Sequence, residues 1–124
     1  MKRILILEDD QGIREVLELL LTSENYNVQS FESIASFLKR DKSELPDLYL
    51  FDVMLPDGSG IDLCSTLNQN SQDIKIPVII MSAHADVNQL KGVCKSEDFI
   101  SKPFDIEYLL SRIQNAVNHS ADSY

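Results

Sequence analysis

Short apolar runs alternate with helix-periodic segments along the whole of this 124-residue chain. Ile4–Leu7, Leu48–Phe51 and Val78–Met81 are continuously apolar, which is typical of strands that are covered on both faces. Weaker runs at Asn27–Phe31 and Phe99–Ile100 bring the predicted strands to five. Because a strand that is apolar on both sides needs a layer of helices on each, this pattern constrains the fold more than any other feature of the sequence.

Helices are predicted between and after these strands. The first carries apolar residues at helical spacing, namely Ile13, Val16, Leu17, Leu20 and Leu21. Apolar residues at 34–38, 61–67 and 109–117 indicate three more, and a capping pattern beginning at Asp86 indicates a fourth. Pro56–Gly60, rich in proline and glycine, is predicted to be a loop. Five strand–helix units predict an α/β protein with a doubly wound, five-stranded parallel sheet and helices on both faces.

The length is that of a single domain, which we predict to span residues 1–120, with 121–124 as a polar tail or the start of a linker. The chain is polar from Asn118 onwards, and fraying is expected there. Cys64 and Cys94 lie in no metal-binding or disulfide pattern and are interpreted as core thiols of a reducing compartment.

The net charge is −9, which argues against nucleic-acid binding by this domain alone, because such binding depends on cations that neutralise phosphates. The apolar run near the start is too short for a signal peptide, and no stretch approaches a membrane span. We therefore predict a cytoplasmic protein that does not bind membranes.

Polar residues follow four of the five predicted strands. They are Glu8, Asp9 and Asp10 after the first strand, Asp52 after the third, Ser82 after the fourth and Lys102 after the fifth. In open parallel sheets, ligands bind outside the carboxyl ends of the strands, so these side chains are expected to meet in one crevice. The groups that meet there suit a phosphoryl group or a cation.

Carboxylates after a strand often cap the next helix, and this is our interpretation of Asp10. Glu8, Asp9 and Asp52 would instead repel one another in a shared crevice unless a cation were present. A magnesium ion, which prefers oxygen ligands and retained waters, would remove that repulsion. Lys102 would supply a second positive charge.

Four segments resemble the receiver domain of two-component response regulators, and the resemblance covers nearly the whole chain. The segments are ILILEDDQGIR, DLYLFDVMLPDGSG, VIIMSA and FISKPF. They occur in order, at intervals of 43, 30 and 20 residues (9 to 52, 52 to 82, 82 to 102). Arg14, five residues after Asp9, identifies Glu8 and Asp9 as the acidic pair. The resemblance implies the flavodoxin-like (CheY-like) strand order 2-1-3-4-5.

The resemblance also implies the roles of the acidic residues. Asp52 would be the phosphoacceptor, receiving a phosphoryl group from a sensor histidine kinase or a phosphotransfer protein. Asp9, Asp52 and the backbone carbonyl of Met54 would bind Mg²⁺ (or Mn²⁺ as an alternative), and Glu8 would act through a bound water. The chain would then be a phosphorylation switch rather than an enzyme, acting on an unknown downstream protein or output domain.

The remaining implied roles fall on the last two strands. Lys102 would pair with Asp52 before phosphoryl transfer, and a cis bond is implied between Lys102 and Pro103. Ser82 would bind a phosphoryl oxygen, and Phe99 would be the switch aromatic that moves when Ser82 does. A plain core aromatic is the other interpretation of Phe99, and the two stay open.

Two other functions are compatible with part of the pattern. One is a receiver-like binding module that is never phosphorylated, although such a module has no need for Asp9, Asp52, Ser82 and Lys102 together. The other is a magnesium-dependent phosphatase of the haloacid dehalogenase type, which would want an aspartate where this chain has Met54. The interval from Ser82 to Lys102 is also short for a receiver, so the fourth helix is expected to be abbreviated.

Overall fold

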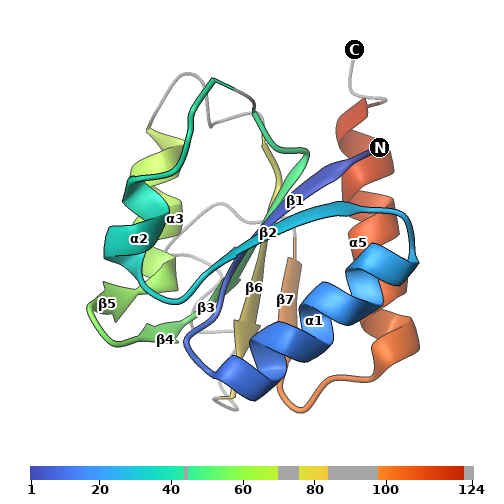
Figure 1. Cartoon of the computed structure of the whole chain (residues 1–124), viewed down its shortest axis with the longest axis horizontal. Coiled ribbons are helices and arrows are strands. Elements are labelled where there is room, and N and C mark those ends of the chain that lie inside the picture. The colour runs from blue at the N-terminus through green and yellow to red at the C-terminus, as the bar shows by residue number, and fades with distance from the viewer. Residues whose placement is uncertain (44, 70–75, 84–97, 122–124) are drawn as a thin grey trace.

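The computed structural model describes the chain except for residues 44, 70–75, 84–97 and 122–124 (Figure 1). The strands of its main sheet are β1 (Arg3–Leu7), β2 (Asn27–Phe31), β3 (Leu48–Asp52), β6 (Val78–Ser82) and β7 (Asp98–Ser101). The helices are α1 (Gln11–Ser23), α2 (Ile34–Leu38), α3 (Gly60–Asn68) and α5 (Ile106–Ala121). The helix predicted from Asp86 and the predicted core thiol Cys94 lie outside the described residues.

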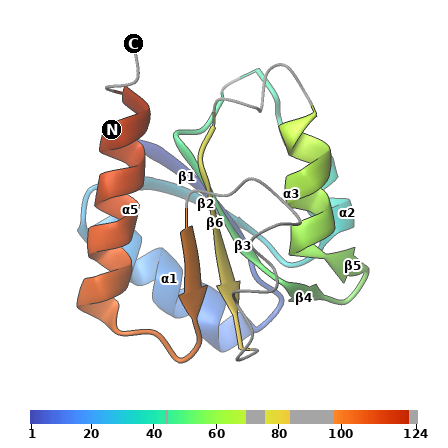
Figure 2. The ribbon, with the colours of Figure 1, turned by 180° about the vertical axis from the view of Figure 1, so that it is seen from behind.

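All five strands of the main sheet are parallel, in the order β2-β1-β3-β6-β7. This is the predicted order 2-1-3-4-5, and the predicted fold class is confirmed. The order reverses between β1 and β3, so the crevice at the carboxyl ends of these two strands is where a ligand is expected. Figure 2 shows the same sheet from behind, with α1 and α5 on one face and α2 and α3 on the other.

Two hydrophobic clusters lie on the two faces of the sheet, because alternate residues of a strand point to opposite sides. The α1/α5 cluster contains Ile4, Ile6, Leu48, Leu50, Ile79, Met81 and Ile100 from the strands and Leu17, Leu21, Leu109, Ile113, Ala116 and Val117 from the helices. The α2/α3 cluster contains Leu5, Leu7, Tyr49, Phe51, Ile76, Val78 and Ile80 with Phe37, Ile61, Leu63, Cys64 and Leu67. The strands predicted from continuous apolar runs are therefore buried on both sides, as expected.

The predicted apolar stripes are partly wrong at their edges. Val16 on α1 is 48% exposed and Leu38 at the end of α2 is 51% exposed, whereas Leu17 and Leu21 are fully buried. The reason is geometric, since the contact between a helix and a flat sheet is narrower than the stripe that a 3.6-residue period marks out. Asn25, just after α1, has a φ of 67° and takes the left-handed position at which a helix commonly ends.

Two predicted irregular segments have regular structure. The Pro56–Gly60 segment, predicted to be a loop, holds the turn and the second strand of a small antiparallel hairpin formed by β4 (Met54–Leu55) and β5 (Gly58–Ser59). Fraying from Asn118 is also wrong, because α5 continues to Ala121. Neither glycine nor proline follows Val117 to end that helix. No helix in the part of the chain that the structure describes is long and apolar enough to cross a membrane.

Candidate functional site

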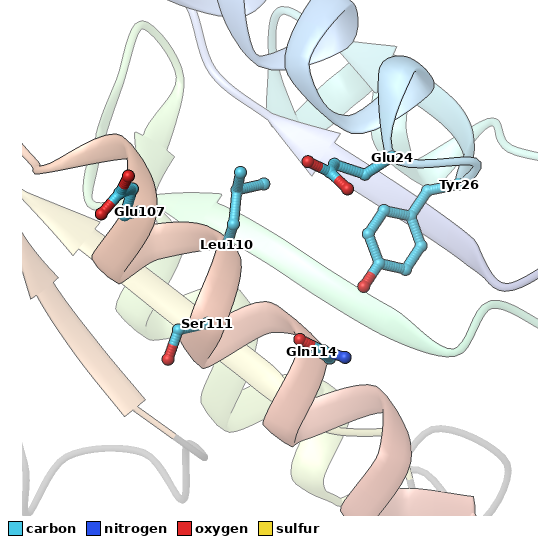
Figure 3. Close-up of a pocket in the computed structure, with 6 residues that line it drawn as sticks. All are labelled: Glu24, Tyr26, Glu107, Leu110, Ser111 and Gln114. Carbon is cyan, nitrogen blue, oxygen red and sulfur yellow. The ribbon is translucent and has the colours of Figure 1, made fainter.

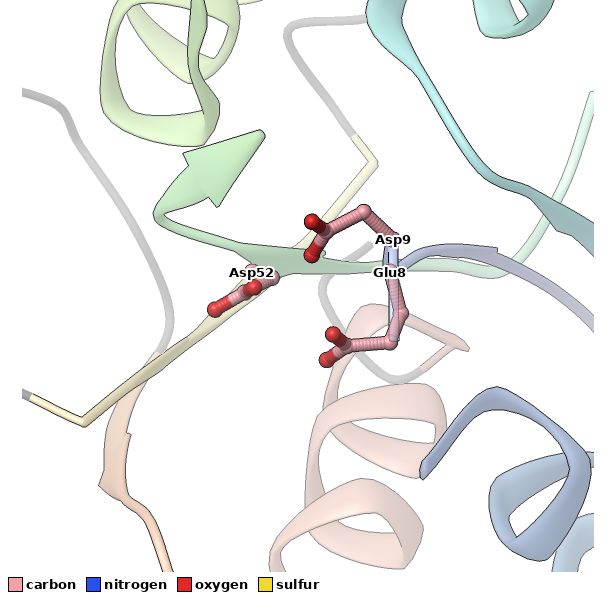
Figure 4. Close-up of side chains that lie close together, drawn as sticks. All are labelled: Glu8, Asp9 and Asp52. Carbon is pink, nitrogen blue, oxygen red and sulfur yellow. The ribbon is translucent and has the colours of Figure 1, made fainter. Parts of the chain in front are cut away.

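Three carboxylates meet at the carboxyl ends of β1 and β3. The strands are in register from Ile4 and Leu48 to Leu7 and Phe51, so Glu8, just after β1, and Asp52, the last residue of β3, are neighbours. Glu8, Asp9 and Asp52 each place a carboxylate oxygen within 4.8 Å of the others (Figure 4). Glu8 is fully buried and Asp52 is 7% exposed, whereas Asp9 is exposed. The reversal of strand order thus brings together the acidic residues that the sequence analysis selected.

Lys102 joins this group from the end of β7. Its Nζ donates to Glu8 Oε2 at 2.6 Å and lies 3.3 Å from Asp52 Oδ1. Only 12% of the lysine side chain is exposed. The pairing expected from the resemblance was with Asp52, but the shorter contact is with Glu8. The bond between Lys102 and Pro103 is cis, as that resemblance implied.

Burial and charge act on the ionisation of both members of the pair. Burial raises the pKa of Glu8, and the charge of Asp52 adds to this effect, while the hydrogen bond from Lys102 opposes it. Burial lowers the pKa of Lys102, but the hydrogen bond and charge of Glu8, with the charge of Asp52, outweigh it and raise the pKa overall. Lys102 therefore stays charged, and one cation faces three carboxylates.

The turn after β1 is ordered by its own hydrogen bonds. The Asp10 amide donates to Glu8 Oε1 at 3.1 Å, and Asp10 Oδ1 accepts from the Ile13 amide at 3.0 Å. Asp10 is thus the N-cap of α1, which confirms the interpretation made from the sequence. Arg14 Nη1 donates to the backbone carbonyl of Glu8 at 2.9 Å. This contact explains why an arginine one turn into α1 accompanies the acidic pair, a role that its spacing alone did not reveal.

Asp52 is held by its neighbours in the chain. Its Oδ1 accepts from the amide of Val53 at 2.9 Å, besides facing Lys102. Gly60 packs against the backbone of Asp52 so closely that a Cβ there would lie 2.0 Å from the Asp52 carbonyl oxygen. The glycine eight residues after Asp52 is therefore required by close packing of two backbone segments.

The other predicted site residues lie around this group. Ser82 is 1% exposed, and its carbonyl accepts from the Lys102 amide at 2.8 Å. Phe99 is half-buried and packs against the α2/α3 cluster. Met54 stands in β4, two residues after Asp52, with its side chain exposed. The structure thus groups Glu8, Asp9, Asp52 and Lys102 tightly, and the roles given to Ser82, Phe99 and Met54 stay predictions.

A separate groove of about 350 Å³ lies between the end of α1 and α5 (Figure 3). It is lined by Glu24, Tyr26, Glu107, Leu110, Ser111 and Gln114. Burial, and then the charge of Glu24, raise the pKa of Tyr26. None of these residues belongs to the predicted site, so the groove does not contribute to the carboxylate crevice.

Comparison with known proteins gives a consistent result. The family model for the response regulator receiver domain matches residues 4–114. The response regulator ArlR of Staphylococcus aureus is 40% identical over 116 residues, which cover 92% of this chain and 52% of that protein. The chain thus spans about half the length of the curated relatives that it matches.

Solved structures agree with the sequence matches. A CheY-like response regulator receiver domain protein from Methanospirillum hungatei superposes with a TM-score of 0.89 at 25% identity, covering 100% of this chain and 99% of that one. Response regulator DrrB of Thermotoga maritima, an OmpR/PhoB homologue, gives a TM-score of 0.84 at 26% identity, covering 96% of this chain and 54% of that one.

Proposed function

The chain belongs to the family of response regulator receiver domains, whose function is phosphorelay signalling, and from this premise we propose that Asp52 is its phosphoacceptor. The observation that carries the proposal is the meeting of Glu8, Asp9 and Asp52 within 4.8 Å, with one lysine beside them. Two buried carboxylates and an exposed one at this distance repel one another, which is costly unless a cation is bound or the site takes part in a reaction of charged groups. The donor would be the phosphohistidine of a sensor histidine kinase or a phosphotransfer protein.

The donor set at this crevice fits a magnesium ion. It consists of oxygen atoms, three of them from carboxylates, and hard divalent cations prefer such ligands. Asp9, Asp52 and the Met54 backbone carbonyl would hold the ion, and Glu8 would reach it through a water. When bound, Mg²⁺ would neutralise negative charge on the transferred phosphoryl group. Mn²⁺ would serve in the same position.

Asp52 and Lys102 would have different roles in phosphoryl transfer. Within the part of the chain that the structure describes, the Val53 amide and Lys102 both contact Oδ1 of Asp52, so Oδ2 would be the reacting oxygen. Oδ2 would form a bond to phosphorus as the phosphorus–nitrogen bond of the phosphohistidine breaks, and the imidazole nitrogen would keep the electron pair and take up a proton. Lys102 would then move from Asp52 towards a phosphoryl oxygen.

The output would be a conformational switch rather than turnover of a substrate. Ser82 would donate its hydroxyl hydrogen to a phosphoryl oxygen, and Phe99, half-buried against the α2/α3 cluster, would change rotamer in response. The chain would work in the cytoplasm, as a signalling switch and not as an enzyme. The target would be another protein or an output domain, since the relatives are about twice as long.

Intact-mass analysis after incubation with acetyl phosphate tests this function. The wild type should gain one phosphoryl group when Mg²⁺ is present and none when EDTA replaces it. Asp52→Asn should gain none in either condition, because its amide is not a nucleophile. If the wild type gains no phosphoryl group with any small-molecule donor, the chain is instead a receiver-like binding module.

A further inference from the structure

The N-terminus of α2 is capped by a residue that lies more than twenty positions further along the chain. Asp57 Oδ1 accepts from the Ile34 amide at 2.9 Å, and Asp57 Oδ2 accepts from the Ala35 amide at 2.9 Å. The two residues are separated from Asp57 by 23 and 22 positions. Asp57 stands at the turn between β4 and β5, in the segment that follows Asp52.

These two bonds complete the hydrogen bonding of the first helical turn. Ser33, the local N-cap, accepts from the Ser36 amide at 3.1 Å, so each of the first three amides of α2 has an acceptor. The first turn of α2 contains no acidic residue of its own. Asp57 therefore supplies the negative charge that a helix N-terminus favours, and the bonds from Ile34 and Ala35 lower its pKa.

The β4–β5 hairpin is consequently held at both ends. At its base, the Gly60 amide donates to the Val53 carbonyl at 2.9 Å, and Gly60 packs against the backbone of Asp52. At its tip, Gly58 approaches α2 so closely that a Cβ would lie 2.9 Å from Ile34 Cδ1. The base is thus tied to the strand that carries Asp52, and the tip is tied to α2.

We propose that Asp57 is a positioning residue for phosphoryl transfer, which holds the β4–β5 hairpin, and with it the Met54 carbonyl, in the orientation that binds Mg²⁺. This inference rests on the proposed function. Met54 pairs with Ser59 across this hairpin, so the direction of its carbonyl follows the orientation of the hairpin as a whole. Asp57 acts through the hairpin and touches neither the phosphoryl group nor the ion.

Mg²⁺ affinity, measured by isothermal titration calorimetry without any phosphoryl donor, separates this role from simple helix capping. Asp57→Ala should weaken Mg²⁺ binding by about tenfold, the lower end of what loss of a residue supporting a metal ligand costs. Asp57→Asn should give an intermediate affinity, because one acceptor oxygen remains while the amide nitrogen cannot accept. Circular dichroism confirms that each variant is folded, and Asp57→Asn, the milder change, serves if Asp57→Ala is not.

Asp41→Ala is the matched control. Asp41 is an exposed aspartate whose Oδ1 accepts from the Ser43 amide at 2.9 Å, so its removal takes away the same charge and a similar hydrogen bond. It should bind Mg²⁺ as the wild type does. The rise in melting temperature on adding Mg²⁺ should be smaller in Asp57→Ala than in Asp41→Ala, since that rise reports ion affinity rather than the strength of the cap.

Two results would overturn the inference, and they differ in whether the proposed function fails as well. If the wild type binds Mg²⁺ and Asp57→Ala and Asp57→Asn bind it equally well, Asp57 is only a helix cap and the proposed function stands. If the wild type itself binds no Mg²⁺, the proposed function fails and the inference fails with it.

Discussion

Replacing Lys102 by methionine tests whether this lysine neutralises the carboxylates when no ion is bound. At an effective dielectric constant of about 20, its contacts of 2.6 Å to Glu8 and 3.3 Å to Asp52 correspond to gross attractions of roughly 6 and 5 kcal/mol. Desolvation of the ammonium group offsets much of this, because the side chain is only 12% exposed. Removing one partner of a buried ion pair leaves the other charge uncompensated, which typically costs about 3–5 kcal/mol of stability. We therefore expect Lys102→Met to lose about 3 kcal/mol of unfolding free energy in EDTA.

Magnesium should reverse about half or more of this loss. The Lys102→Met site is one unit more negative, so it should bind Mg²⁺ more tightly than the wild type. The stability deficit in EDTA minus the deficit in saturating Mg²⁺ must equal the gain in binding free energy. Recovery of about 1.4–3 kcal/mol therefore corresponds to an affinity gain of about tenfold to one-hundredfold.

Urea denaturation in EDTA and in saturating Mg²⁺ gives the two stability deficits. Mg²⁺ titration of the folded proteins gives the change in binding free energy, which must match the difference between those deficits. Lys42→Met, at an exposed lysine, is the control and should change none of the three measurements appreciably. The deficit of Lys102→Met in EDTA should shrink at pH 5 compared with pH 7.5. The reason is that Glu8, whose pKa burial already raises, can take up a proton in the folded state. An unchanged stability in EDTA, or weaker Mg²⁺ binding, would refute this account of Lys102.

Four further predictions concern the backbone and the caps around the site. Gly60→Ala should destabilise the fold by about 1–3 kcal/mol, because its Cβ would lie 2.0 Å from the Asp52 carbonyl oxygen. Gly12→Ala in α1, where the nearest contact would be 3.3 Å from an exposed carboxylate, should be neutral or stabilising in the same thermal denaturation series. Asp10→Ala should cost about 1 kcal/mol through loss of the α1 cap, and equal stability to the wild type would contradict that assignment. The folded-state pKa of Asp57 is lowered, so its contribution should be complete above the unfolded pKa of about 4 and be lost at lower pH. The stability difference between wild type and Asp57→Asn should therefore narrow below pH ~4 in acid titrations, and a difference that widens there would be inconsistent with the observed cap.

The fold was predictable because its strongest signals are local. Leu48–Phe51 and Val78–Met81 are apolar at every position, which is typical of a short strand covered on both faces. Once the strands were placed, the rule for parallel sheets predicted that Asp52 and Lys102 would lie at one edge. The structure places them 3.3 Å apart although fifty positions separate them in the sequence.

The features that were missed depend on contacts between distant segments. Nothing in the sequence near Ile34 indicates that Asp57 caps α2, because the two meet only after the sheet has formed. The preference of Lys102 for Glu8 over Asp52 likewise reflects a difference of less than one ångström between two side-chain contacts. The exposure of Val16 depends on how α1 rests on the sheet, which a hydrophobic period does not specify.

The division of the core into two clusters has a consequence for protein engineering. Asp52 follows Leu48 and Leu50, which belong to the α1/α5 cluster, whereas Ser82 follows Val78 and Ile80, which belong to the α2/α3 cluster. The two rows of apolar residues therefore face different layers of the core, yet both rows lead to the carboxyl edge of the sheet, where the Val53 amide donates to the Met81 carbonyl at 3.1 Å and links the two strand ends. Libraries that vary apolar side chains of one layer at constant volume should keep that link intact, whereas proline at position 53 would remove its donor and uncouple the two layers.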